Sequence, residues 1–393
     1  MRPAAIALVL VTLLAAQEPP AQHLLGRAPL ENIIAISAGR FTSTDADDVL
    51  ALQDLGRVQF ASAPGLGRAE AGLFRLALLR LESGRFSPVW QSQPMLASTV
   101  PQARLAANAW TAADINSDSK QEILLFGPDS CTVVSFDQFT ARTRSVPMRG
   151  AWVTDAAACD LNSDSVPEIT TLELSPLDSA LTGRLLRVYH VTDSGLVAVS
   201  EYIGGIDWGP DIELTLLGSA RLEEYWGTLP VLAGIYHSVR PSMYAVLADY
   251  SNKRKKPETN DQVTTETASG SEALTSELSG EALRLTSHPF PWRKWFTKDE
   301  ILPAGRLSLF NVGDTLVAYG YFVPGSGRVA SSRPTPNSFA ALQDGAWRLL
   351  PLTDAASRIS GPVCRFSLDG TQGWLELRDD VFRFYPGEIF HWR

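Results

Sequence analysis

Short runs of apolar, β-branched and aromatic residues recur along most of the chain, with polar turns rich in Gly, Asp and Ser between them. Residues 153–159, 168–174, 184–191 and 196–202 show the pattern most fully, and Asp193-Ser194-Gly195 supplies a hairpin-type turn between the last two runs. Runs of this length bounded by turn residues predict β-strands. The pattern therefore predicts an all-β protein whose strands come in groups of four.

Two loops within these groups nearly repeat each other. Oxygen side chains occupy positions 1, 3, 5 and 9 of each loop, and position 7 offers a backbone carbonyl. The residues are Asp114, Asn116, Asp118, Lys120 and Glu122 in the first loop, and Asp160, Asn162, Asp164, Val166 and Glu168 in the second. Ca²⁺ takes about six to eight oxygen ligands, so each loop is a candidate calcium site. An EF-hand is excluded, because position 12 (Leu125 or Thr171) carries no acid and no helical pattern flanks the loops.

The pattern D-x-N-x-D-x-x-x-E, running straight into a strand, resembles the FG-GAP or VCBS repeat of integrin α-subunit propellers and bacterial surface proteins. The resemblance implies a β-propeller in which each loop joins the first two strands of a blade and binds Ca²⁺, and hence two structural calcium ions. The chain departs from the family at loop positions 4 and 6, where Ser117, Ser119, Ser163 and Ser165 replace the usual glycines. Side chains are penalised at positive φ, so we expect weaker calcium binding than the family norm.

Four further segments of the chain can be aligned with the two loops. Each of these has a small residue, then Arg, then a large apolar residue, followed by a strand-like run. The arginines at position 1 are Arg40, Arg221, Arg306 and Arg365. Position 9 keeps an acid in two of the segments, as Asp48 and Asp314.

Six repeats of four strands predict a six-bladed propeller. Seven blades are the alternative, because an excursion at residues 57–72 lengthens the first repeat. The sixth repeat is expected to end the chain with strands at residues 374–378, 381–385 and 388–392.

The arginines at position 1 suggest an internal replacement for a metal ion. We hypothesise that each guanidinium pairs with a carboxylate of its own loop. The candidate partners are Asp45, Asp47 or Asp48 for Arg40, Glu223 or Glu224 for Arg221, Asp314 for Arg306, and Asp369 for Arg365. The alternative is that these side chains point into solvent, where an ion pair adds little stability.

Composition and the N-terminal residues indicate the compartment. The 393 residues are 45% hydrophobic, enough for a large core, and the net charge of −9 argues against nucleic acid as a partner. Residues 1–16 combine a basic start with a short apolar stretch, which predicts a secretory signal peptide; an uncleaved anchor is the alternative. No later segment is long and apolar enough for a membrane helix. We therefore expect a secreted, periplasmic or cell-surface protein.

Residues 22–393 are predicted to form one propeller domain with an insertion at about residues 251–281. The insertion is rich in Thr, Ser and Glu, a composition that favours disorder. Cys131, Cys159 and Cys364 match neither a zinc nor a redox spacing, so we expect buried thiols.

Catalytic motifs are absent from the sequence. The five histidines are scattered, and nucleophile-elbow, zinc-protease, P-loop and dinucleotide patterns do not occur. Aromatic residues in the loops that lead into the innermost strands would either contact a ligand or fill gaps between blades. The ligand-face candidates are Trp110, Trp152, Trp208, Asp211 and Trp295.

We therefore predict a non-catalytic binding, adhesion or scaffold module for a protein or glycan partner. One alternative is a propeller enzyme acting on polysaccharide, as a lyase or glycosidase. The other is an accessory subunit of a larger extracytoplasmic complex.

Overall fold

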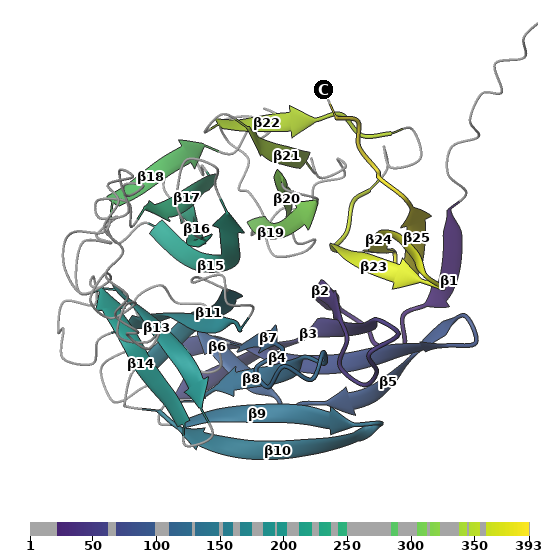
Figure 1. Cartoon of the computed structure of the whole chain (residues 1–393). Coiled ribbons are helices and arrows are strands. Elements are labelled where there is room, and N and C mark those ends of the chain that lie inside the picture. Colours follow the sequence, from purple (N-terminus) through teal and green to yellow (C-terminus); the bar gives the residue numbers. More distant parts are fainter. Residues whose placement is uncertain are drawn as a thin grey trace, which may run out of the picture.

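The structure is a computed structural model. It describes residues 22–61, 68–98, 110–127, 130–148, 152–159, 166–174, 184–192, 195–202, 212–221, 228–236, 243–249, 284–289, 305–312, 315–322, 338–343, 346–353 and 359–392. This part of the chain contains 25 strands and no helix. Its strands form six antiparallel sheets that stand in a ring, which confirms the predicted all-β propeller (Figure 1). Residues 1–16 and 251–281, the predicted leader and insertion, lie outside the described residues.

The sheets follow the order of the chain, and the innermost strands are β2, β7, β11, β15, β19 and β23 (Figure 1). The first sheet contains β2 (Ile33–Gly39), β3 (Asp48–Ala61), β4 (Arg68–Glu82) and β5 (Arg85–Gln91), with β6 (Met95–Ser98) paired to β4; the second contains β7 (Trp110–Ala113), β8 (Glu122–Phe126), β9 (Ser130–Asp137) and β10 (Thr140–Pro147). The third contains β11 (Trp152–Cys159), β12 (Glu168–Leu174), β13 (Arg184–Thr192) and β14 (Gly195–Tyr202); the fourth contains β15 (Ile212–Arg221), β16 (Thr228–Tyr236), β17 (Met243–Asp249) and β18 (Arg284–Pro289). The fifth contains β19 (Gly305–Val312), β20 (Thr315–Phe322), β21 (Ser338–Gln343) and β22 (Ala346–Leu350); the sixth contains β23 (Val363–Leu368), β24 (Thr371–Arg378), β25 (Val381–Pro386) and β1 (His23–Arg27).

The core lies between neighbouring sheets. Middle strands such as β24 are buried along most of their length, because another sheet covers each of their faces. Trp374 has no exposed surface and meets the edges of Phe310 and Phe339 of the fifth sheet, with ring centroids 5.0 and 5.5 Å away. Cys131 and Cys364 are buried free thiols, as predicted for these two residues. Among the described residues, no helix is long and apolar enough to cross a membrane.

The sixth sheet combines the first and the last strand of the described chain. The N-terminal strand β1 pairs with β25 and forms the outermost strand there. The prediction that residues 388–392 fill this place is therefore wrong. These residues run to the fifth sheet instead, where the His391 amide donates to the Pro351 carbonyl (2.8 Å) and Phe390 bridges to Leu352. Phe390 is 3% exposed, so this segment contributes to the core between the fifth and sixth sheets.

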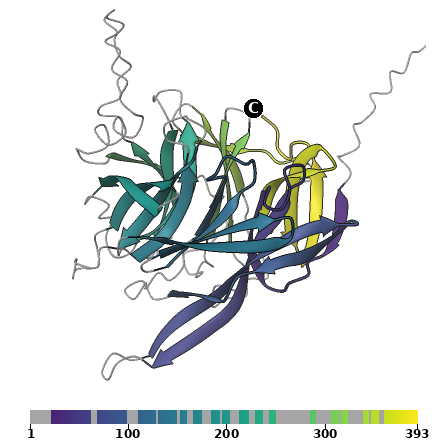
Figure 2. The ribbon, with the colours of Figure 1, turned by 60° about the horizontal axis from the view of Figure 1, so that its bottom comes forward.

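The predicted excursion of the first repeat is a β-arm. Pairing between β2 and β3 stops at Gln53, whereas β3 and β4 continue as a hairpin that projects from the ring (Figure 2). The register shifts by one residue between Asp54 and Arg57. Gly56 adopts φ 98° there and donates its amide hydrogen to the Asp54 carboxylate at 2.8 Å. A bulge with glycine in the left-handed region bends a strand, so it marks the base of the arm.

The links between the first and second strands vary in length around the ring. Eight residues form this link in each of the first three sheets, at 40–47, 114–121 and 160–167. Only residues 313–314 and 369–370 form it in the fifth and sixth sheets. Arg306 and Arg365 consequently lie inside β19 and β23, and their alignment with loop position 1 is wrong. In the sixth sheet, Asp369 (φ 51°) and Gly370 (φ 78°) form a tight two-residue turn that leaves no room for a longer loop.

Candidate functional site

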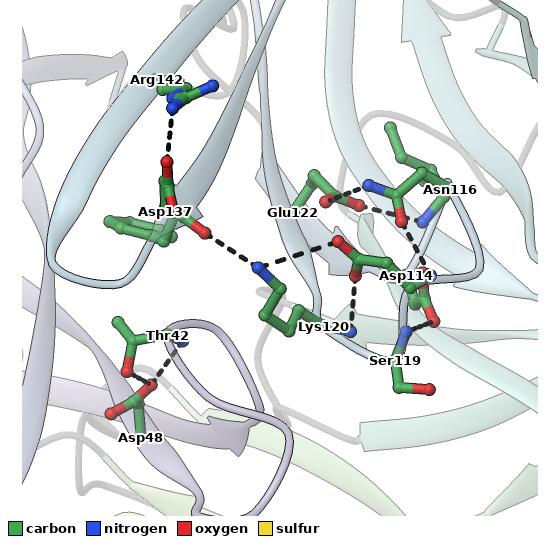
Figure 3. A network of polar contacts seen from close by, with 12 residues as sticks. Thr42, Asp48, Asp114, Asn116, Ser119, Lys120, Glu122, Asp137 and Arg142 are labelled. Carbon is green, nitrogen blue, oxygen red and sulfur yellow. Dashed lines mark hydrogen bonds and ion pairs between the residues drawn. The ribbon is translucent and has the colours of Figure 1, made fainter.

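Residues 114–121, which join β7 to β8, form the candidate site that the structure describes most fully (Figure 3). The backbone curls tightly, with Ser117 at φ 60° and Ser119 at φ 68°. These are the two positions where the resembled repeat has glycine. The loop thus adopts the predicted curled shape, and two serines take the left-handed backbone conformation, which is energetically unfavourable for residues with a side chain.

Carboxylate and amide oxygens of this loop hold its backbone in place (Figure 3). Asp114 accepts hydrogen bonds from the amides of Asp118 (3.1 Å) and Ser119 (2.8 Å). Asn116 accepts a second one from Asp118 (2.9 Å), and Asp118 accepts one from the Lys120 amide (2.8 Å). Short polar side chains commonly stabilise turns in this way.

Glu122 stands at the end of the loop as the first residue of β8 and is 4% exposed. Its carboxylate accepts hydrogen bonds from the Ile115 amide (3.1 Å) and from the Asn116 side-chain amide (2.9 Å). Burial raises the pKa of Glu122 to about 7, and the charges of Asp118 and Asp114 add to the increase. A cation at this loop would therefore relieve an electrostatic cost.

The donors of the loop suit calcium in chemistry, since three carboxylates and an amide oxygen are hard oxygen ligands. The nearby cation is Lys120, whose Nζ lies 3.8 Å from Asp118 Oδ2 and donates to the Phe136 carbonyl (3.1 Å). In the described part of the chain, no group of three or more His, Cys, Asp or Glu side chains is arranged to hold a metal ion. In this structure the loop carboxylates bind amides rather than converge on one point.

The second predicted loop is described only at its end. Asp160, Asn162 and Asp164 lie outside the described residues, and Val166 is 39% exposed. Glu168 is fully buried as the first residue of β12, and its Oε1 lies 3.6 Å from His190 Nδ1. Glu168 therefore occupies the same place in the third sheet that Glu122 occupies in the second.

The loop of residues 40–47 shares this arrangement. Asp48 begins β3, is 1% exposed, and accepts hydrogen bonds from the Thr42 amide (2.9 Å) and hydroxyl (2.7 Å). Burial raises the pKa of Asp48. Thr42 stands at loop position 3, where Asn116 stands in the second sheet. In both loops the residue at position 3 bonds to the buried acid at position 9.

Hydrogen bonds also link these loops around the ring. The Gln121 amide donates to the Arg40 carbonyl (2.6 Å), and the Ser367 amide of β23 donates to Asp47 (2.8 Å). Gln121 and Asp47 both stand at position 8. In the described structure, the residue at position 8 therefore connects the loop of the second sheet to the first sheet, and the loop of the first sheet to the sixth.

The predicted arginine pairings fail where the structure describes them. Arg40 is exposed and, among the described residues, forms no ion pair with an acid of its loop. Arg365 pairs with Glu388 (2.7 Å) and lies over the Trp374 ring, 5.0 Å from its centroid, whereas Asp369 is occupied in the turn. The side chains of Arg221 and Arg306 lie outside the described residues.

Two buried acids within strands were not predicted. Glu173 of β12 has no exposed surface and accepts hydrogen bonds from Thr171 (2.7 Å), Tyr189 (2.7 Å) and Arg187 (2.8 Å). Both acids stand between two leucines in an apolar run, as Leu172-Glu173-Leu174 and Leu375-Glu376-Leu377. An acid inside such a run signals a buried, paired carboxylate.

The second of these acids is Glu376 of β24, which also has no exposed surface. It accepts hydrogen bonds from the Tyr385 hydroxyl (2.7 Å) and the Ser360 amide (2.8 Å). Burial and the neighbouring carboxylate raise the pKa of each tyrosine partner, Tyr189 and Tyr385, above the ordinary range. Both networks join strands within a sheet.

The predicted ligand face is described at one residue. Trp110 begins β7, is half-buried, and packs against the apolar cluster between the first and second sheets. This packing matches the alternative in which tryptophans fill gaps between sheets. Trp208, Asp211, Trp295 and the side chain of Trp152 lie outside the described residues.

No family model matches the chain, and no curated protein matches it. One solved structure is a complex from S. cerevisiae of a Dbp5 variant bound to Nup159, a Gle1 variant, IP6 and ADP. A chain of that complex is similar to this one over 95% of this chain and 96% of its own length, at 9% identity and a TM-score of 0.36. A likeness at this score carries no argument about function, so the fold rests on the sheets themselves.

Proposed function

We propose that the protein is a non-catalytic binding or scaffold module, secreted, periplasmic or on the cell surface, that presents a calcium-stabilised propeller to a protein or glycan partner. The observation that carries the proposal is the loop of residues 114–121, whose hard oxygens surround a curled backbone next to the buried Glu122. A structural cation would neutralise these acids and fix the loop. The buried acids Glu173 and Glu376 support a non-catalytic role, because structural partners already engage them.

We further propose that the six sheets are the blades of an FG-GAP or VCBS-type propeller with six blades rather than seven. Support comes from the three links of equal length, each followed by a buried acid: Asp48, Glu122 and Glu168. The length of the first repeat is explained by the arm of β3, β4 and β6 without a further sheet. The proposed calcium ligands are those of the two predicted loops, with Asp160, Asn162 and Asp164 completing the second.

Calcium binding is tested by melting the protein in a calcium series and in chelator. An ion that binds only the folded state raises the melting temperature with its concentration. Asp118→Asn should abolish much of this rise, because it keeps the oxygen that accepts the Lys120 amide and removes one charge. Asp369→Asn is the matched control, since Asp369 is also an exposed aspartate between the first and second strands of a sheet.

A calcium-independent melting temperature for the wild type would refute the metal site. Equal responses of the two variants would refute the assignment to this loop. The binding role is tested by immobilising the full chain, with and without chelator, and identifying proteins and glycans captured from extracellular extract. The proposal expects the same captured species to be lost in chelator and with Asp118→Asn but retained with Asp369→Asn.

A further inference from the structure

An arginine of β4 lies beside the buried acid that follows the loop of residues 40–47. Val49 of β3 pairs with Leu79 of β4. The next residues along these antiparallel strands, Asp48 and Arg80, therefore stand opposite each other on one face of the sheet. Arg80 Nη1 donates to the Thr42 hydroxyl (3.0 Å), and this hydroxyl donates in turn to the Asp48 carboxylate (2.7 Å). A single hydroxyl thus connects the guanidinium to the buried acid.

Further contacts fix the Arg80 side chain, which is 25% exposed. Its guanidinium carbon lies 4.7 Å from the centroid of the Phe139 ring, in the turn between β9 and β10. Its Nε lies 4.0 Å from Glu82, but Glu82 is 58% exposed, and such an ion pair adds little stability. Burial raises the pKa of Asp48, whereas hydrogen bonds from Thr42 and the charge of Arg80 oppose the increase. Arg80 is therefore a fixed cation whose charge acts on Asp48.

The second sheet has an uncharged residue at the same position. Ile123 of β8 pairs with Val134 of β9, so the next residue of β9, Ser135, stands opposite Glu122. At Glu122, burial raises the pKa, and the charges of the two loop aspartates raise it further. The neighbour of Ser135 on β10 is Arg142, whose guanidinium pairs with Asp137. The position opposite Glu122 thus lacks the cation that Arg80 supplies to Asp48.

The third sheet carries a histidine there. Ile169 pairs with Tyr189, which places His190 opposite Glu168. The His190 Nδ1 atom lies 3.6 Å from Glu168 Oε1. One position of the third strand, opposite the buried acid, therefore holds arginine, serine and histidine in the first three sheets.

We propose that the residue at this position determines whether a loop needs a metal ion, and that Arg80 takes the place of the ion at residues 40–47. The first loop is then stable without calcium, whereas Ser135 leaves the second loop dependent on it. A guanidinium keeps its charge at every pH and calcium concentration, so it compensates Asp48 permanently. What concerns the second loop rests on the proposed calcium role, but the role of Arg80 beside Asp48 does not.

Urea unfolding of the full chain in chelator tests the role of Arg80. Arg80→Met removes the charge, keeps a long side chain, and should lower the midpoint. Asp48→Asn keeps an oxygen to which Thr42 can donate, and in that background Arg80→Met should lower the midpoint about half as much or less. Glu82→Gln is the matched control, because it neutralises the other acid near Arg80 and should leave the loss unchanged. Equal losses with and without Asp48→Asn would overturn the proposal.

A gain of charge in the second sheet provides the converse test. Ser135→Arg should raise the melting temperature in chelator and reduce the further rise with calcium to about half or less, because it gives Glu122 a cation of the chain. Ser135→Gln, of similar length but uncharged, is the matched control and should do neither. An unchanged calcium response with Ser135→Arg would refute the rule for this position.

Calcium titrations separate this proposal from the proposed function. Asp48→Asn should keep the full calcium-dependent rise of the wild type, and loss of that rise would show that the first loop binds calcium. A wild type that does not respond to calcium would refute the part concerning the second loop together with the proposed calcium role. The urea comparison in chelator would still decide the role of Arg80.

Discussion

Three buried tyrosine hydroxyls allow the contribution of a buried charge to be measured. Tyr189, Tyr385 and Tyr319 are at most 2% exposed, and each hydroxyl donates one hydrogen bond of 2.7 Å to its acceptor. The acceptors are the carboxylates of Glu173 and Glu376 for the first two, and the neutral carbonyl of Gly361 for Tyr319. Replacing each tyrosine with phenylalanine removes the hydroxyl and keeps the ring.

The expected losses follow from the acceptor. A hydrogen bond to a charged group contributes about 1.5–3 kcal/mol to the free energy of unfolding, and one between neutral groups about 0.5–1.5 kcal/mol. Tyr189→Phe and Tyr385→Phe should therefore each cost about 2 kcal/mol, and Tyr319→Phe about 1 kcal/mol. Arg187→Met should cost more, about 3–5 kcal/mol, because it leaves the buried Glu173 carboxylate without its cation.

Urea unfolding provides the measurement, with the change in midpoint compared at constant m-value. Tyr319→Phe serves as the internal control for Tyr385→Phe, because the rings and the hydrogen-bond lengths match. The Tyr189 hydroxyl also accepts a hydrogen bond from Arg187 (3.1 Å), which Tyr189→Phe removes as well. Equal losses at all three tyrosines would show that the charge of the acceptor does not matter. A loss with Arg187→Met smaller than that with Tyr189→Phe would contradict the view that Arg187 compensates Glu173.

Three further predictions concern single groups. Burial raises the pKa of Glu122 from 4.5 to about 7, so between these pH values the folded state binds more protons than the unfolded state. The free energy of unfolding in chelator should therefore fall as the pH rises from about 4.5 to 7. The melting temperature of Glu122→Gln, measured over the same pH range, should lack this part of the fall. A Cβ at Gly361 would lie 1.8 Å from the Leu377 carbonyl oxygen, so Gly361→Ala should lower the free energy of unfolding in urea by about 3 kcal/mol. Gly370 has a positive φ but no atom within 4 Å of an added Cβ, so Gly370→Ala should cost only about 1 kcal/mol. Leu25→Asp should destabilise the protein by about 3 kcal/mol, because Leu25 is only 6% exposed. Leu24 is 64% exposed, so Leu24→Asp should change the melting temperature little. Similar effects of the two variants would refute the role of β1 in the core.

Much of the ring was predictable where local pattern determines structure. The predicted run at residues 168–174 matches β12, and those at 184–191 and 196–202 match β13 and β14 to within one residue. Alternating or continuous apolar runs between turn residues carry this information locally. The position-9 acid of the first repeat, Asp48, was also placed correctly, because it follows a link of the same length as Glu122 does.

The mistakes arose where distant segments decide the outcome. Nothing in the five residues of β1 indicates a partner more than 350 residues away, at β25. Arg365 was aligned with a loop because its local sequence resembles the other repeats, yet the Asp369-Gly370 turn leaves no loop there. Its actual partner, Glu388, lies in the C-terminal segment, and the stacking on Trp374 depends on packing that sequence spacing does not encode.

The position of β1 also sets an order of events during synthesis. Among the described strands, β1 is synthesised first and its hydrogen-bonding partner β25 last. The intervening sheets can assemble as their own neighbouring strands emerge, whereas the hydrogen bonds of β1 must wait for β25. Until then β1 and the apolar faces of the first and sixth sheets, including Leu25, Phe86 and Phe382, remain uncovered. A nascent chain that stalls before residue 381 would therefore display this surface to chaperones and proteases, whereas a chain that includes β25 can cover it.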